Sequence, residues 1–161
     1  MQLDELYQEI ILDHWKHPRG KGLRDPTEST GGAPRRHAES HQVNPTCGDE
    51  MTVRVGLSGD ERVEVSYDGL GCSISQASAS VLYELVDGRP LGEAMKRYDA
   101  FAELVGGRGQ VEPDEELLED GIAFAGVAKF PARVKCALLA WMAFRDAAAQ
   151  AAGTVDGGGA G

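Results

Sequence analysis

The chain contains only three cysteines, and each lies in a distinct local context. Cys47 belongs to the run Asn-Pro-Thr-Cys-Gly-Asp and Cys72 follows Gly-Leu-Gly, so both lie where glycine and proline favour turns that present side chains outward. Cys136 belongs to the run Arg-Val-Lys-Cys. Together with Asp49, the three thiols form a candidate four-ligand metal site. Such a site requires segments far apart in the sequence to converge, which strongly constrains the fold.

Length and composition predict one domain that does not depend on metal for its core. A chain of 161 residues buries roughly two-thirds of its unfolded surface, so a metal here would point to function. The formal net charge of −10 disfavours nucleic acid as a partner, because phosphate backbones repel it. No stretch approaches the roughly 20 apolar residues that span a bilayer, and the first residues do not resemble a secretory signal. We therefore expect a cytoplasmic protein with no membrane segment, whose cysteines are thiols or ligands.

The first half of the chain predicts a helix, a loop and a three-stranded sheet. Apolar residues at helical spacing begin at Leu3, and Pro18 with Gly20 ends that helix. Residues 21–36 have no periodicity and predict a loop or mobile arm. Residues 40–43, 51–57 and 62–67 alternate or are rich in β-branched residues, and turn-forming residues separate them. This pattern predicts an antiparallel meander.

The second half predicts helices. Apolar positions indicate a helix over residues 73–86, opened by Cys72, and a shorter helix near 91–105. The acidic run 112–120 predicts a solvated helical start. Pro131 is well placed as the first residue of a last helix that runs to about Ala149. The fold class is thus α+β, with one domain over residues 1–149 and a disordered alanine- and glycine-rich tail over 150–161.

The candidate ligands have the chemistry of a zinc site. A Cys-x-Asp turn supplies one soft and one hard ligand, and a thiol at a helix start lies at the positive end of the helix dipole, which favours the thiolate. Three thiolates and a carboxylate around Zn²⁺ carry a formal charge of about −2, which Arg133 and Lys135 can offset. Because carboxylate is the poorest match to a borderline-soft ion, we expect this site to open for ligand exchange.

Simpler interpretations stand beside the metal site. A free cysteine is commonly a small buried hydrophobe, and Cys136 shares its helical side with Leu139, Ala140 and Ala143. The Gly-Leu-Gly turn lacks the third glycine and the lysine of a phosphate loop, so we interpret it as structural.

The four histidines are also interpreted as structural or surface residues rather than as metal ligands. His37 and His41 are predicted to be surface residues. His14 and His17 lie at the end of the first helix and favour capping or packing over ligation.

Four ordered motifs resemble the SufU family of iron–sulfur cluster assembly proteins over about residues 3–144. The motifs are Asp13-His14-Trp15-Lys16-His17-Pro18-Arg19, Asn44-Pro45-Thr46-Cys47-Gly48-Asp49, Gly69-Leu70-Gly71-Cys72-Ser73, and Phe130-Pro131-Ala132-Arg133-Val134-Lys135-Cys136. The resemblance implies an α+β fold shared with SufE, IscU and NifU, with zinc bound by Cys47, Asp49, Cys72 and Cys136. It also implies a cysteine desulfurase of the SufS type as partner.

Two departures separate the chain from IscU-type scaffolds. Those scaffolds carry a histidine before the last cysteine and a Leu-Pro-Pro-Val-Lys chaperone motif, whereas this chain has Lys135 and Phe-Pro-Ala-Arg-Val at residues 130–134. The resemblance therefore implies a zinc-dependent sulfurtransferase whose Cys47 accepts persulfide sulfur once a desulfurase histidine displaces it from zinc. Arg133 stabilises the charge of the site or meets the partner, and the Suf scaffold complex receives the sulfur. The alternative is a scaffold that holds an iron–sulfur cluster on the same ligands.

Overall fold

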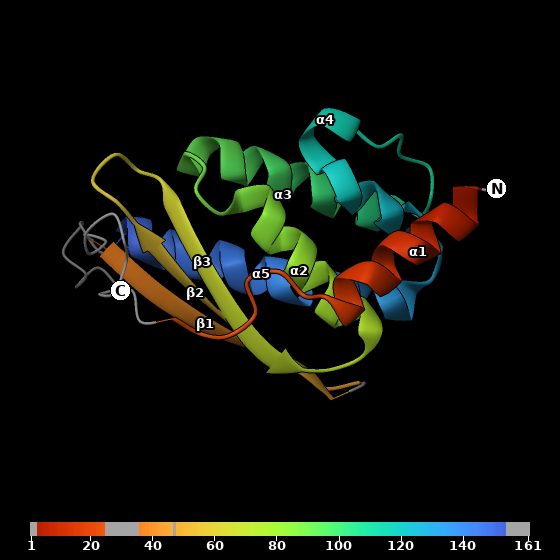
Figure 1. Ribbon diagram of the computed structural model, residues 1–161, viewed down its shortest axis with the longest axis horizontal. Coiled ribbons are helices and arrows are strands. Elements are labelled where there is room, and N and C mark those ends of the chain that lie inside the picture. The colour runs from red at the N-terminus through yellow and green to blue at the C-terminus, as the bar shows by residue number, and fades with distance from the viewer. Residues whose placement is uncertain (1–2, 25–35, 47, 154–161) are drawn as a thin grey trace.

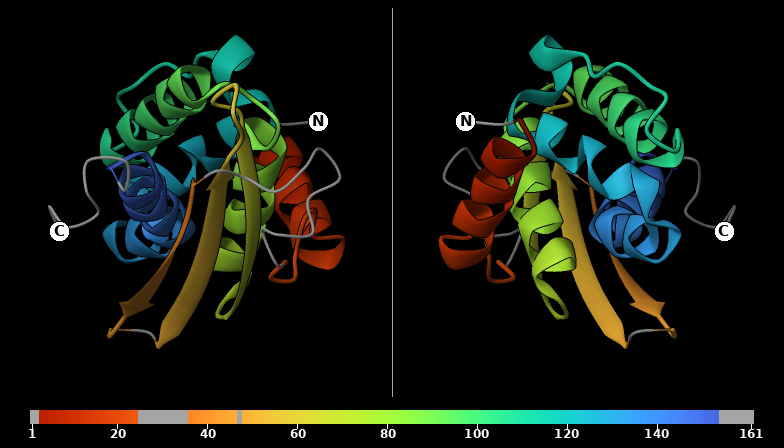
Figure 2. Two further views of the ribbon diagram at one scale, coloured as in Figure 1. Left: turned by 90° about the vertical axis from the view of Figure 1, so that its left-hand side faces the viewer. Right: turned by 90° about the vertical axis from the view of Figure 1, so that its right-hand side faces the viewer.

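The architecture is a three-stranded antiparallel sheet with helices packed on one of its faces (Figures 1 and 2). The computed structural model describes residues 3–24, 36–46 and 48–153. The elements in chain order are α1 (Leu3–Lys16), β1 (Arg36–Asn44), β2 (Asp49–Leu57), β3 (Val63–Leu70), α2 (Ser73–Val86), α3 (Leu91–Gly106), α4 (Glu115–Leu118), the 3-10 helices η2 (Glu119–Ala125) and η3 (Val127–Lys129), and α5 (Pro131–Gly153). The predicted α+β fold and its three-stranded meander are confirmed.

The sheet has the order β1-β2-β3, and its alternation sets which side chains reach the core. Along β2, Met51, Val53 and Val55 are buried under the helices, while the residues between them point to the opposite face. In the β1–β2 register Asn44 lies opposite Asp49, at the end of the sheet where these two strands are connected. The same alternation places Asp49 on the helix-facing side, and its side chain is buried.

Helices α2 and α5 form the layer next to the sheet, and the other helices pack outside them. Helix α5 packs on β1 and β2, whereas α2 packs on β3 and against α1. Trp141 of α5 stacks on Phe101 of α3 with ring centroids 4.3 Å apart, and Phe124 meets Phe101 edge to face. All three rings are fully buried, so the ligand-bearing helix α5 is fixed in the main hydrophobic core.

The boundaries of two elements differ most from the sequence-based expectation, and β3 also continues to Leu70, past the predicted end at residue 67. Strand β1 begins at Arg36, four residues before the predicted start, because its polar residues hide the alternation. Helix α5 continues to Gly153, so residues 150–153 of the predicted tail are helical. Ala151 is buried there, and the Arg36 guanidinium donates a 3.1 Å hydrogen bond to the Ala152 carbonyl. Residues 154–161 of the tail, and residues 25–35 of the predicted arm, lie outside the described residues.

Candidate metal centre

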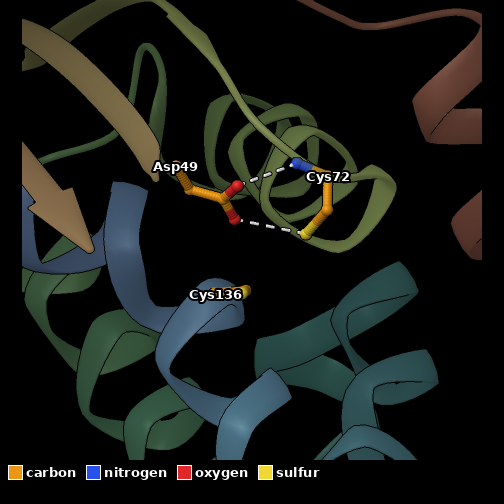
Figure 3. A group of neighbouring side chains, drawn as sticks. All are labelled: Asp49, Cys72 and Cys136. Carbon is orange, nitrogen blue, oxygen red and sulfur yellow. Dashed lines mark hydrogen bonds between the residues drawn. The ribbon is translucent and has the colours of Figure 1, made fainter. Parts of the chain in front are cut away.

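Three of the four predicted ligands lie close together (Figure 3). Asp49 begins β2, Cys72 is the N-cap residue of α2, and Cys136 lies in the second turn of α5. One ligand atom from each of these residues lies within 4.8 Å of the other two. The fourth predicted ligand, Cys47, lies outside the residues that the structure describes.

The Asp49 carboxylate is held by the start of α2. The Cys72 backbone N–H donates to Asp49 Oδ1 at 3.1 Å, and the Cys72 thiol donates to Asp49 Oδ2 at 3.2 Å. Asp49 is buried, whereas Cys72 is exposed. The carboxylate is therefore fixed by a backbone donor at a helix N-terminus, and the thiol beside it faces an open cleft.

Gly71 is required for this close approach. A Cβ added there would lie 2.8 Å from Asp49 Cγ and 2.5 Å from Ser75 Oγ. Ser75 is fully buried, and its hydroxyl donates to the Cys72 carbonyl at 3.0 Å. The glycine before the cysteine thus leaves room for the carboxylate, a role that the sequence pattern alone did not reveal.

Asn44 connects the β1–β2 turn to Cys136. Its side-chain Nδ2 donates to Cys136 Sγ at 3.9 Å, and its Oδ1 accepts from the Thr46 backbone N–H at 3.1 Å. Asn44 is 6% exposed and Cys136 is 7% exposed. Sequence reasoning interpreted Asn44 only as part of a turn, although an asparagine before a proline at the end of a predicted strand was an available signal.

The donor set fits zinc. Ligands about 2.3 Å (sulfur) and 2.1 Å (oxygen) from a tetrahedral Zn²⁺ are about 3.6 Å apart, close to the 3.2 Å between Cys72 Sγ and Asp49 Oδ2. Two thiols and one carboxylate supply the sulfur-rich environment that zinc and iron–sulfur clusters prefer over magnesium or calcium. The remaining coordination position is left for Cys47 or another ligand.

A cleft opens in front of the thiols. Its walls include Asn44, Cys72, Ile74, Arg133 and Cys136. The Arg133 guanidinium carbon lies 5.1 Å from the centroid of the Phe130 ring. Arg133 is exposed and lines this cleft.

A second group of potential ligands surrounds His14. The His14 side chain is fully buried, with Nδ1 2.7 Å from Ser80 Oγ and Nε2 2.8 Å from Asp120 Oδ2. Glu84 Oε1 lies 3.4 Å from the same Nε2. The predicted packing role of His14 is therefore correct, and polar partners on α2 and η2 accompany it. We name His14, Ser80, Glu84 and Asp120 the His14 cluster.

Arg19 extends the His14 cluster outward. Its guanidinium donates to Asp13 Oδ2 at 2.7 Å, and its backbone N–H donates to Ser80 Oγ at 2.9 Å. The hydrogen bond from Arg19 lowers the pKa of the Asp13 carboxyl below its usual value. The other three histidines, among them the predicted surface residues His37 and His41, are exposed.

The fold and the centre together define a class of protein, and the chain belongs to the family of NifU-like N terminal domains, which it matches over residues 6–137. This confirms the predicted kinship with IscU and NifU. A structure of a NifU-like N-terminal protein from Brucella abortus shares the fold, with a TM-score of 0.73 at 24% identity over 90% of this chain and 93% of that one.

Within the family, two curated relatives are equally similar in sequence. The zinc-dependent sulfurtransferase SufU of Bacillus subtilis is 36% identical over 152 residues, which are 94% of this chain and 95% of the relative. The iron–sulfur cluster assembly scaffold protein IscU of Streptococcus pyogenes is 36% identical over 146 residues, 91% of this chain and 84% of the relative. The crystal structure of FiSufU from Fervidobacterium islandicum has a TM-score of 0.70 at 31% identity, covering 91% of this chain and 99% of that one.

No helix in the described part of the chain is long and apolar enough to cross a membrane.

Proposed function

We propose that this protein is a zinc-dependent sulfurtransferase of iron–sulfur cluster assembly. It accepts persulfide sulfur from a cysteine desulfurase of the SufS type and passes it to the Suf scaffold complex. The observation that carries the proposal is the meeting of Cys72, Cys136 and the buried Asp49 carboxylate at an open cleft. The similarity to SufU of Bacillus subtilis supports it.

Asp49, Cys72 and Cys136 would hold zinc together with Cys47. Bound zinc would keep thiols in the thiolate form near neutral pH. Asp49 is positioned for this role by the backbone N–H of Cys72, and Asn44 supports Cys136 through its amide. Cys47, which precedes Gly48 and Asp49 in the sequence, would be the ligand that reacts.

The proposed transfer is a thiol–persulfide exchange. The Cys47 thiolate attacks the outer sulfur of the desulfurase persulfide, and the sulfur–sulfur bond of that persulfide breaks. The desulfurase cysteine leaves as a thiolate, and Cys47 carries the persulfide. Arg133, a cation at the rim of the cleft, is placed to attract the anionic persulfide as it enters.

Mass spectrometry of the protein after turnover with desulfurase and cysteine tests the proposal. We expect one zinc per chain in the purified protein and one added sulfur atom on Cys47. A Cys47→Ala variant should accept no sulfur and should not stimulate the desulfurase. Full stimulation by Cys47→Ala would refute the assignment of Cys47 as the acceptor.

A cluster scaffold is the second candidate, and the similarity to IscU of Streptococcus pyogenes favours it. The same cysteines would then hold iron and sulfide. Anaerobic reconstitution with iron and sulfide separates the two: a scaffold yields a coloured cluster that transfers to an apoprotein, whereas a sulfurtransferase keeps its zinc and yields none.

A further inference from the structure

An apolar groove lies beside the candidate metal centre, between α1 and the start of α5. Tyr7, Ile11 and Leu12 of α1 form one wall, and Val127 and Phe130 form part of the other. Leu12 is 44% exposed and Phe130 is 52% exposed. Large apolar side chains exposed together around a groove mark an interaction surface, whereas single exposed ones do not. We name this feature the α1 groove.

The α1 groove adjoins the cleft of the metal centre. Ile74 and Arg133 line both cavities, so the groove and the cleft are neighbours. A partner that reaches into the cleft therefore also covers the α1 groove.

The charge around both cavities is opposite to that of the whole chain. The net charge is −10, yet the charged residues that line the α1 groove are Lys129 and Arg133, and those that line the cleft are Arg133 and Lys135. The sequence from 121 to 145 contains no aspartate or glutamate. None of the ion pairs within the described ranges involves these three cations. Lys129, which lines the α1 groove but not the cleft of the metal centre, is thus available to a carboxylate of a partner.

We propose that the α1 groove docks a segment of the cysteine desulfurase that carries an apolar side chain flanked by carboxylates. This inference rests on the proposed function. Direct sulfur transfer requires the donor sulfur to touch the acceptor thiol, and a standard protein interface buries about 800 Å² on each partner. A donor seated on the cleft therefore extends over its immediate surroundings, where the α1 groove offers apolar contact and Lys129 offers charge.

Two leucines of α1 provide a matched test of the apolar contact. Leu12 lines the α1 groove and is 44% exposed, whereas Leu6 is 42% exposed on the same helix and does not line it. Titration of zinc-loaded full-length protein with a SufS-type desulfurase should give a dissociation constant about tenfold higher for Leu12→Ser than for wild type. Leu6→Ser should bind like wild type. Equal affinities for Leu12→Ser and wild type would overturn the proposal.

A charge reversal tests the carboxylate component. Lys129→Glu should weaken binding about tenfold and flatten its dependence on salt, because an attraction becomes a repulsion. Lys96→Glu on α3, exposed and away from both cavities, makes the same change in net charge and should leave the affinity within about twofold of wild type. If both reversals weaken binding equally, the total charge rather than the α1 groove determines the affinity and the proposal is wrong.

Two further readouts separate this inference from the function on which it rests. If the Leu12 and Lys129 variants lose affinity but wild-type Cys47 never gains sulfur, the proposed function fails and the docking surface stands. If Cys47 gains sulfur while the groove variants bind normally, the docking surface fails alone. Sedimentation of the protein without desulfurase should show the same state for wild type and Leu12→Ser. A wild-type dimer that Leu12→Ser dissociates would make a second copy the occupant and overturn the proposal.

Discussion

Among the residues that the structure describes, two clusters bring three potential metal ligands within 4.8 Å, and they differ in chemistry and packing. In the centre formed by Asp49, Cys72 and Cys136, the ligands include two sulfurs, and Cys72 faces an open cleft. In the His14 cluster there is no sulfur, and His14 Nε2 lies 2.8 Å from Asp120 Oδ2.

The hydrogen bonds of His14 indicate a structural role for the His14 cluster. His14 Nε2 lies 2.8 Å from Asp120 Oδ2 and His14 Nδ1 lies 2.7 Å from Ser80 Oγ, and both are hydrogen-bond distances. The hydrogen bonds of the His14 cluster therefore join α1 to α2 and η2, whereas the sulfur-containing centre has a donor set that zinc prefers. Proximity of ligating residues alone does not distinguish a metal site from a structural ion pair.

The largest expected effect is on metal affinity at the sulfur centre. Structural zinc sites contribute about 10–16 kcal/mol, or roughly 3 kcal/mol per ligand, so Cys72→Ser should weaken zinc binding more than about 100-fold. Competition with a chromogenic chelator measures this. Asp120→Asn in the His14 cluster is the control and should retain one zinc with unchanged affinity. Loss of zinc from Asp120→Asn would contradict the assignment of the zinc to the sulfur centre.

The next largest effect is on stability at the His14 cluster. His14→Ala removes a fully buried ring and its contacts with Ser80 and Asp120, so the free energy of unfolding should fall by about 2–4 kcal/mol. Urea denaturation measures the change, and the folded fraction should still hold one zinc. His17→Ala, which removes an exposed histidine, should change stability by less than about 0.5 kcal/mol. An equal loss in both variants would contradict a structural role for the cluster.

A smaller effect is expected at Gly71, where the absence of a side chain leaves room for the Asp49 carboxylate. Gly71→Ala should push the Asp49 carboxylate out of place and weaken zinc binding about tenfold, because misplaced supporting groups typically cost 10–100-fold. Gly92→Ala is the matched control, since its added Cβ would have no atom within 4 Å. If zinc affinity is unchanged in Gly71→Ala, the position of the carboxylate does not matter to the centre.

The smallest expected effect concerns the ion pair between Asp13 and Arg19, which lies next to the His14 cluster. The lowered pKa of Asp13 means that its pairing with Arg19 stabilises the folded protein at neutral pH and is lost as pH falls through that lowered pKa. Asp13→Asn should therefore be slightly less stable than wild type at neutral pH, and the two should converge in acid. Thermal melts across this pH range measure the difference. A difference that grows toward acid would have the wrong sign for this pairing.

Local sequence signals predicted most of the fold. The bounds of α2 followed from the apolar spacing between Cys72 and Asp87, and the start of α5 followed from Pro131. The early part of β1 was missed because its residues are mostly polar. The last turn of α5 was missed because alanine-rich sequence is compatible with both a helix and a tail, and only packing decides between them.

Long-range contacts limited prediction of the sites. Cys72, Cys136 and Asp49 were predicted as ligands because their residue types and turns carry chemistry. The support from Asn44 depends on a contact across 92 positions of sequence, and the pairing of His14 with Asp120 spans 106. The acidic run was interpreted as solvated, which holds for Glu115 and Glu116, whereas Asp120 contributes to the His14 cluster.

The position of Cys136 on α5 has a consequence for biosynthesis. Asp49 and Cys72 are translated long before Cys136. For most of synthesis, the nascent chain therefore lacks one of the candidate ligands. Cys136 lies on α5, the helix that also carries Trp141 and completes the hydrophobic core. If the chain binds zinc as proposed, the ion is therefore expected to enter after the core has formed rather than to nucleate folding.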